Sequence, residues 1–188
     1  MVERGGCAWR LGSGAELRPL ALTDGTELQG LIEANRDHLA AWLPWAAGQT
    51  LADTHAFLAE AQAQAAANDG FQAAIRRDGA IAGVCGFVGV DWANRRTTIG
   101  YWLAAEQQGR GLVTAAVAAL ADHALGVWGL DRVEIRAATG NRRSRAVPER
   151  LGFSREAIFR KAQQLGGRAH DLAVYARVAG DPPPGRDP

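Results

Sequence analysis

The chain has 188 residues, 47% of them apolar, and a formal net charge of +1 at pH 7. This is enough for one domain with a sizeable core, and the near-zero charge argues against the basic excess that is typical of nucleic-acid binders. Cys7 and Cys85 lack disulfide or metal-ligand spacing, so no metal site is predicted. No apolar run could span a bilayer and no signal-peptide pattern is present, so we expect a cytoplasmic protein that binds neither nucleic acid nor membranes.

The N-terminal third is predicted to hold one strand and two helices. Residues 1–12 have no clear period and are expected either to add a short edge strand or to remain loose, so residues 1–14 are taken as an N-terminal edge segment. The alternation from Ala15 to Leu20 predicts a strand. Thr23 and Asp24 are expected to cap a helix that runs through Glu33.

Two tryptophans then flank a helix-breaking proline in the string Trp42-Leu43-Pro44-Trp45. Buried tryptophans are usually structural, and the alternative is that Trp42 and Trp45 wall a substrate cleft. The apolar spacing from Thr50 to Ala67 predicts a further helix.

Three consecutive strands are predicted in the middle of the chain. They are expected over Phe71–Arg76, Ile81–Val90 and Thr97–Leu103. Asp78-Gly79 between the first two strands is a strong hairpin signal. Antiparallel strands that lead into a glycine loop and a helix indicate an α+β fold.

The glycine loop is the clearest candidate for a binding site. Gly109 and Gly111 precede a helix whose apolar residues recur at helical spacing up to Ala124. Backbone N–H groups at the start of that helix would form an anion site, most naturally for a phosphate or pyrophosphate. A plain strand-to-helix turn is the alternative. The loop lacks the Gly-Lys-Ser/Thr ending of a Walker loop, and Thr114 stands where a dinucleotide fingerprint has its third glycine.

The C-terminal third is predicted to hold three strands and one helix. The strands are expected over Asp131–Ala137, Ser154–Lys161 and Arg168–Val178. Asn141 is expected to cap a short helix that ends near Leu151, and Pro148 inside this helix is unusual. Residues 179–188 are rich in proline and glycine, and we expect a disordered tail.

Three separated motifs resemble the GNAT N-acetyltransferases, and in particular their RimJ/RimL-like branch of ribosomal-protein N-terminal acetyltransferases. Gln108-Gly109-Arg110-Gly111-Leu112-Val113 is similar to the family's acyl-CoA pyrophosphate loop, with Val113 in place of Gly or Ala. The Trp-Leu-Pro-Trp string resembles the branch. The run from Asn141 to Phe153 resembles its Asn-x-x-Ser…Glu-x-Leu-Gly-Phe signature.

The resemblance implies a GNAT domain over residues 15–178, with a mixed, mostly antiparallel sheet of six to seven strands flanked by helices. It implies acetyl-CoA as the acyl donor and Ser144 as the group that protonates the leaving thiolate, with helix capping as the alternative for Ser144. Trp42, Trp45 and Tyr101 are expected to border the substrate cleft. The residues expected to bind the donor are Trp102, Leu103, Gln108, Gly109, Arg110, Gly111, Leu112, Val113, Thr114 and Asn141.

The general base is not evident from the sequence. Two positions at which relatives carry a glutamate are Thr98 and, by a tentative alignment, Gln163. Glu156, His170 and Asp171 remain candidates, although adjacent strand residues point to opposite faces, which argues against a His170–Asp171 dyad.

The expected function is acetyl transfer from acetyl-CoA to a primary amine, most naturally a protein N-terminal α-amine. An α-amine of pKa near 8 is roughly a tenth neutral at pH 7, which suits an enzyme that lacks a strong base. The alternatives are a small amine or antibiotic as acceptor, another acyl donor such as succinyl-CoA, and a CoA-binding sensor without activity. A homodimer is a further possibility left open by the resemblance.

Overall fold

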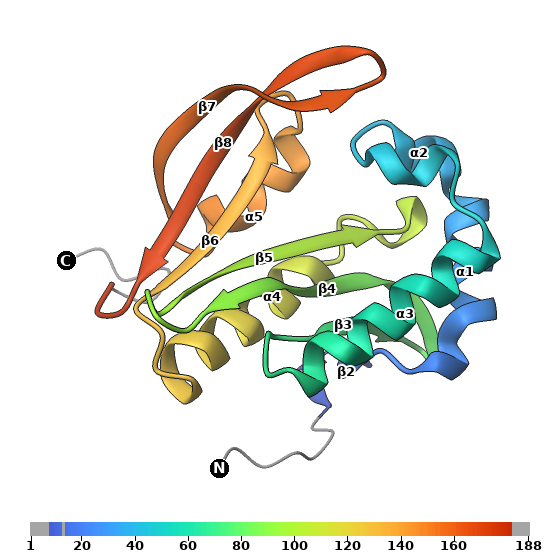
Figure 1. The fold of residues 1–188 in the computed structure, drawn as a ribbon, viewed down its shortest axis with the longest axis horizontal. Helices are drawn as coiled ribbons and strands as arrows, with labels where there is room; N and C mark the ends of the chain where they lie inside the picture. Colours follow the sequence, from blue (N-terminus) through green and yellow to red (C-terminus); the bar gives the residue numbers. More distant parts are fainter. Residues whose placement is uncertain (1–7, 13, 182–188) are drawn as a thin grey trace.

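The computed structural model describes residues 8–12 and 14–181 and contains one sheet in the order β1-β2-β3-β4-β5-β6-β8-β7 (Figure 1). Neighbouring strands are antiparallel except β5 and β6, which are parallel. The strands are β1 (Trp9–Gly12), β2 (Ala15–Pro19), β3 (Gln72–Arg77), β4 (Ala80–Asp91), β5 (Arg96–Leu103), β6 (Arg132–Ala138), β7 (Ser154–Leu165) and β8 (Arg168–Val178).

Five α-helices accompany the sheet in the described residues. They are α1 (Gly25–Ala34), α2 (Arg36–Ala40), α3 (Leu51–Ala66), α4 (Leu112–Asp122) and α5 (Arg142–Arg150). Short 3-10 turns cover Leu22–Asp24, Pro44–Ala47 and Ala105–Gln107, and a π-helical turn (His123–Val127) extends α4. None of these helices is both long and apolar enough to cross a membrane.

The predicted α+β class and the mostly antiparallel sheet are confirmed, but the predicted strand number was one too low. The additional strand is β1, which pairs with β2 at the edge of the sheet. Trp9 holds it there, because its ring stacks on Phe71 at 5.5 Å between centroids and meets His123 edge-on at the same distance. The predicted disordered tail falls mostly on residues 182–188, outside the described part of the chain.

The first helical segment starts differently from the expectation. Ala21 is the residue before the 3-10 turn, and the Asp24 carboxylate, three residues later, accepts the Ala21 N–H at 2.8 Å. Arg18 also donates to this carboxylate at 2.8 Å. Asp24 therefore caps the turn from inside it, and α1 follows directly at Gly25.

Two cores lie on opposite faces of the sheet (Figure 1). The larger one packs α4 and α5 against the rear of the sheet, with Leu120, Ile135 and Tyr175 almost fully buried. The smaller one packs α1 and α3 on the front, through Leu28 and Leu58, against β3, β4 and Trp102 of β5. Within residues 8–12 and 14–181, no helix covers the front of the β6–β8–β7 half.

The strands β5 and β6 pair over three residues and then separate. Arg96, Thr97 and Thr98 lie opposite Arg132, Val133 and Glu134. From Ile99 onward β5 stays paired with β4, while β6 continues along β8. The sheet therefore opens into a V-shaped gap between its two halves. The C-terminal parts of β5 and β6 form the two sides of this gap.

Candidate active site

The edge of β5 that faces the gap presents free backbone groups. Ala104 donates its N–H to the Ala82 oxygen at 2.9 Å, and the register continues from this pair without a shift as far as Phe87 and Ile99. Because backbone groups alternate in direction along an antiparallel strand, the N–H groups of Leu103 and Tyr101 point into the gap. The Trp102 N–H points to β4. Of the two donors predicted from the sequence, Leu103 faces the gap and Trp102 does not.

The glycine loop connects β5 to α4 through a backbone conformation with positive φ angles, which glycine adopts readily. Gly109 and Gly111 have φ values of +76° and +75°, where a side chain would be strained. Gly111 is the N-cap of α4 and offers no side-chain acceptor, and Ala115 donates the first helical bond to the Gly111 oxygen. The N–H groups of Leu112, Val113 and Thr114 thus have no carbonyl four residues back within the helix.

The predicted loop residues play different parts. Arg110 is exposed, and its side chain extends from the loop between the two glycines. Leu112 is buried in the rear core, Val113 packs against that core, and Thr114 is half-buried. At these three positions only backbone groups stay available to a ligand at the helix start, which agrees with an anion site built from amides.

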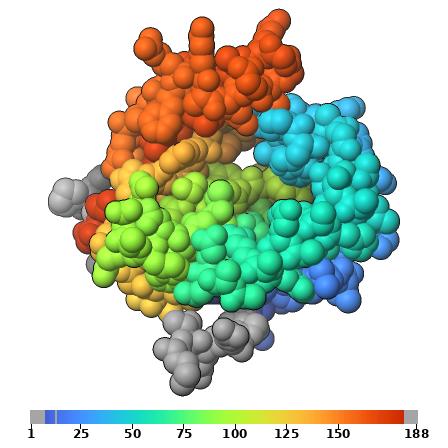
Figure 2. All heavy atoms as spheres, viewed as in Figure 1, coloured from blue at the N-terminus to red at the C-terminus, as the bar shows by residue number. Residues whose placement is uncertain are grey.

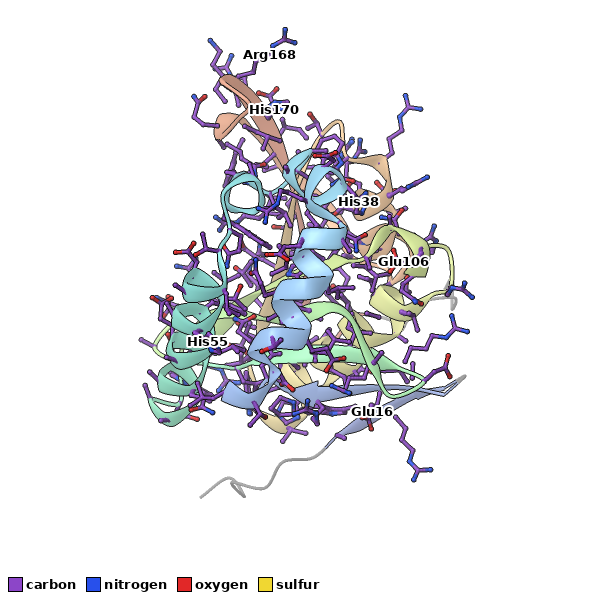
Figure 3. All side chains as sticks on the ribbon, turned by 90° about the vertical axis from the view of Figure 1, so that its right-hand side faces the viewer. Glu16, His38, His55, Glu106, Arg168 and His170 are labelled. Atoms are coloured by element: carbon purple, nitrogen blue, oxygen red, sulfur yellow. The ribbon has the colours of Figure 1, made fainter. Side chains whose placement is uncertain are left out.

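The Gln108 side chain contacts residues of two helices, α2 and α5. Its amide nitrogen lies 2.9 Å from His38 Nε2 on α2. Its amide oxygen accepts a hydrogen bond from the Arg143 guanidinium at the start of α5. Figure 3 shows His38 on α2 close to the segment that carries Glu106, just before the glycine loop.

At the start of α5, Asn141 and Ser144 form a helix cap. The Asn141 side-chain oxygen accepts the Ser144 N–H at 3.1 Å, which confirms the predicted cap. Tyr101 of β5 donates its hydroxyl to the Ser144 backbone oxygen at 2.8 Å, and Ser144 Oγ lies 3.3 Å from the same hydroxyl. Burial raises the pKa of the Tyr101 hydroxyl, so it stays protonated near neutral pH.

The three residues predicted to border the substrate cleft are not all together. Trp45 meets Trp102 at 6.2 Å between ring centroids, on the front face of the sheet. Tyr101 follows the opposite alternation and packs against the rear core, beside Ser144. The Trp42 ring instead reaches the turn before α5, where it lies against Gly140.

The segment of residues 35–49, which we call the clasp, connects the two halves of the sheet across the gap. On the β5 side, Asn35 accepts the Ala105 N–H at 2.8 Å, in addition to the contacts of His38 and Trp45 described above. On the other side, Gln163 of β7 donates to the Trp42 oxygen at 3.3 Å. Arg36 fixes the shape of the clasp by donating to its backbone oxygens.

A bulge in β7 allows Gln163 to reach the clasp. The register of β7 against β8 shifts between Phe159 and Gln163, and Lys161 adopts a φ of +52°. Asp171 of β8 holds this bulge by accepting the Lys161 N–H at 2.8 Å. Bulges of this kind redirect side chains.

The uncovered front face forms a hollow. Figure 2 shows it between the β7–β8 hairpin (orange), the clasp (light blue) and the β4–β5 region (green). A cavity of about 370 Å³ lies in it, lined by β4, β5 and β6. Thr98 and Glu134, which are partners across the parallel pair, line this cavity with Arg136.

Glu134 is the buried carboxylate of the hollow, with 7% of its surface exposed. Burial by itself raises its pKa, but hydrogen bonds from Arg136 at 2.8 Å and Arg132 at 2.9 Å outweigh this effect. The net result is a pKa below the ordinary value. Glu134 is therefore an anion near neutral pH and a weak base.

The carboxylates proposed from the sequence as a base are engaged elsewhere. Glu156 forms two hydrogen bonds with Arg132, at 3.0 and 2.6 Å, and these lower its pKa. Asp171 holds the β7 bulge. His170 lies opposite Gln163 on the hairpin, and neighbouring Arg168 points away from the body of the protein (Figure 3).

Several residues of the site were missed by the sequence analysis. Asn35 is 6% exposed, and a buried asparagine has to find partners, but its partner lies 70 residues along the chain. In the sequence, Glu134 is one of the polar residues that alternate with apolar ones along a strand, so it does not stand out as a site residue. Nothing in the sequence links His38 to Gln108.

The gap, the uncapped helix start and the glycine loop are the features of an acyl-CoA transferase, and the comparison with known families agrees. Residues 15–154 match the model described as an acetyltransferase (GNAT) domain. The chain belongs to this family and is an acetyl-CoA-dependent N-acetyltransferase.

Individual relatives cover most of the chain. The putative ribosomal N-acetyltransferase YdaF of Bacillus subtilis is 38% identical over 162 residues, which are 85% of this chain and 88% of the relative. The microcin C7 self-immunity acetyltransferase MccE, solved with acetyl-CoA and AMP, is 30% identical with a TM-score of 0.86, covering 94% of this chain and 98% of MccE. RimL, a ribosomal L7/L12 α-N-protein acetyltransferase solved with coenzyme A, is 25% identical with a TM-score of 0.87. The match covers 92% of this chain and 98% of RimL.

Proposed function

We propose that the acceptor of this N-acetyltransferase is the N-terminal α-amine of a protein. The observation that carries the proposal is the state of the carboxylates around the hollow. Glu134 and Glu156 are both ion-paired with arginines and have lowered pKa values, and the position of a possible base on β5 is Thr98. Such a site suits an amine that is already partly neutral at pH 7. An α-amine is roughly a tenth neutral, and a lysine only about one part in two thousand.

The names of the relatives support the same acceptor. YdaF is called a putative ribosomal N-acetyltransferase, and RimL acts on the α-amine of a ribosomal protein. A small-molecule acceptor is the second candidate, because MccE, an immunity protein against microcin C7, has the same fold at a TM-score of 0.86.

We assign the donor-binding roles as follows. The amides at the start of α4, with Arg110 beside them, bind the pyrophosphate of acetyl-CoA. The pantetheine arm occupies the gap and bonds to Asn141. The Leu103 N–H donates to the thioester carbonyl oxygen, where negative charge develops during attack.

The reaction is a direct transfer between the two bound substrates. The neutral amine nitrogen attacks the thioester carbon, a C–N bond forms, and the C–S bond breaks. The nitrogen releases a proton to water, and the departing thiolate receives one from Ser144, which water then restores. No covalent enzyme intermediate is required, and alignment of the two substrates supplies much of the rate.

The test is thiol release from acetyl-CoA with short peptides, each supplied with a free and with a blocked N-terminus, beside a panel of small amines. We expect turnover with free N-termini only. Turnover confined to small amines would favour the second candidate. Binding of CoA without thiol release from any acceptor would indicate a sensor. The homodimer and the cytoplasmic location remain predictions, the first of which gel filtration with light scattering can test.

A further inference from the structure

Pro148 leaves one carbonyl of helix α5 without its helical partner. In an α-helix the carbonyl of residue i accepts the N–H of residue i+4, and proline has no N–H to give. The carbonyl four residues before Pro148 belongs to Ser144. Pro148 is buried and lies inside α5, which continues past the proline to Arg150.

Tyr101 supplies the missing donor from a different element. Its hydroxyl donates to the Ser144 oxygen at 2.8 Å, and no other hydroxyl donates to this oxygen in the described residues. Ser144 Oγ lies 3.3 Å from the same hydroxyl, and the Ser144 N–H is held by Asn141. The N–H, the carbonyl and the side chain of Ser144 are thus all fixed by hydrogen bonds.

The Tyr101 bond also crosses the gap in the sheet. Tyr101 belongs to β5, whose N–H groups at Tyr101 and Leu103 point into the gap. Helix α5 follows β6 after a short turn and packs on β6, β7 and β8 of the other half, as well as on α4. A hydrogen bond between them fixes the distance between Ser144 and the gap-facing edge of β5.

We propose that Pro148 and Tyr101 together position Ser144 for proton transfer: the proline frees the Ser144 carbonyl, and the tyrosine uses it to fix α5 against β5. The inference rests on the proposed role of Ser144 as proton donor. Tyr101 is a positioning residue in this arrangement, since it acts through Ser144.

The experiment compares Tyr101→Phe, Pro148→Ala and the double variant. Tyr101→Phe removes the donor and leaves the Ser144 carbonyl without a partner, so we expect both a lower melting temperature and a kcat reduced by roughly tenfold. Pro148→Ala introduces an N–H that competes with the tyrosine for the same carbonyl, so kcat falls by a smaller factor.

The double variant separates positioning from stability. The amide introduced at position 148 satisfies the Ser144 carbonyl, so the melting temperature recovers toward that of the native protein. The link to β5 is still missing, so kcat stays low while the affinity for acetyl-CoA, measured by calorimetry, stays unchanged. Recovery of kcat together with stability would mean that Tyr101 is merely structural, and would overturn the proposal.

A second comparison places Tyr101→Phe in the Ser144→Ala background. A residue that acts through Ser144 should then have no further effect on kcat. An equal loss of kcat in both backgrounds would overturn the proposal. If Ser144→Ala alone retains full activity, the role assigned to Ser144 under the proposed function fails, and this outcome is recognised before any Tyr101 variant is made.

Discussion

Gln163 on β7 donates its side-chain amide to the backbone oxygen of Trp42, and this hydrogen bond of 3.3 Å joins the clasp to the second half of the sheet. The Trp42 ring adds a packing contact at Gly140, and Asn35, His38 and Trp45 hold the clasp to the first half. One side of the hollow therefore depends on a contact between residues 121 positions apart in the sequence.

Replacing Gln163 with methionine keeps the length of the side chain and removes the donor. We expect the KM for the acceptor to rise by roughly threefold to tenfold, as the loss of one neutral hydrogen bond implies. Hydrogen exchange of residues 36–49 should become faster, and the affinity for acetyl-CoA should not change. Gln164→Met, at an exposed neighbour on the same strand, is the control. Equal behaviour of the two variants would contradict a role for the Gln163 contact.

Ser144→Ala tests the proton donor directly. The helix cap survives, because Asn141 accepts the backbone N–H of residue 144 and not its side chain. We expect kcat to fall by about tenfold or more, at or below the lower end of general-acid effects, since a thiolate is a weak base. The dissociation constant of acetyl-CoA should stay within about twofold, as measured by calorimetry. Unchanged turnover would remove the proposed role.

Arg110→Ala tests whether a side chain adds to the amides of the glycine loop. The guanidinium is exposed, so its contribution to the fold is small and its loss should not lower the melting temperature. We expect acetyl-CoA to bind about tenfold more weakly at low salt, with a smaller difference at high salt because the attraction is screened. The control is Arg150→Ala, an exposed arginine at the far end of α5. If affinity is unaltered, backbone groups alone bind the phosphates.

Glu134→Gln should change how stability depends on pH. The folded protein lowers the pKa of Glu134 below its ordinary value of 4.5, so its ionised form stabilises the fold above that pH. This contribution is lost as pH falls through the lower, folded value. We expect the variant to be less stable by about 1–2 kcal/mol at pH 7, with the difference shrinking as the solution is acidified below pH 4.5.

Urea unfolding at a series of pH values, with Glu106→Gln as an exposed control, measures the Glu134 effect. A stability difference that persists unchanged at the lowest pH would show that the amide disturbs packing and that charge is not the cause.

The sequence predicted the elements well where the pattern is local. The apolar spacing that begins at Thr50 locates α3, and Asp78-Gly79 locates the β3–β4 hairpin. The glycine loop was predicted for the same reason, because Gly109 and Gly111 leave few other conformations. Strand β1 was less certain, since it is held by Trp9 packing on rings that are distant in the sequence.

The parts of the site that were not predicted are contacts between distant residues. The Asn35–Ala105 bond and the His38–Gln108 contact each join residues 70 positions apart. Pro148 was noticed as unusual, but its partner could not be found, because a hydroxyl on β5 replaces an N–H of the helix. Local patterns fix what each segment becomes, and tertiary packing decides which polar groups meet.

The gap between β5 and β6 gives the protein two strand edges in its interior. An unpaired edge normally lies at the periphery, where it invites pairing with other chains. Here the two edges face each other, so a ligand with amide groups of its own can complete the hydrogen bonding that the strands leave open. Ligand binding and folding are therefore linked, and the melting temperature should rise with the concentration of acetyl-CoA. The donor substrate would thus act as a part of the folded structure, and the protein would unfold less often when acetyl-CoA is bound.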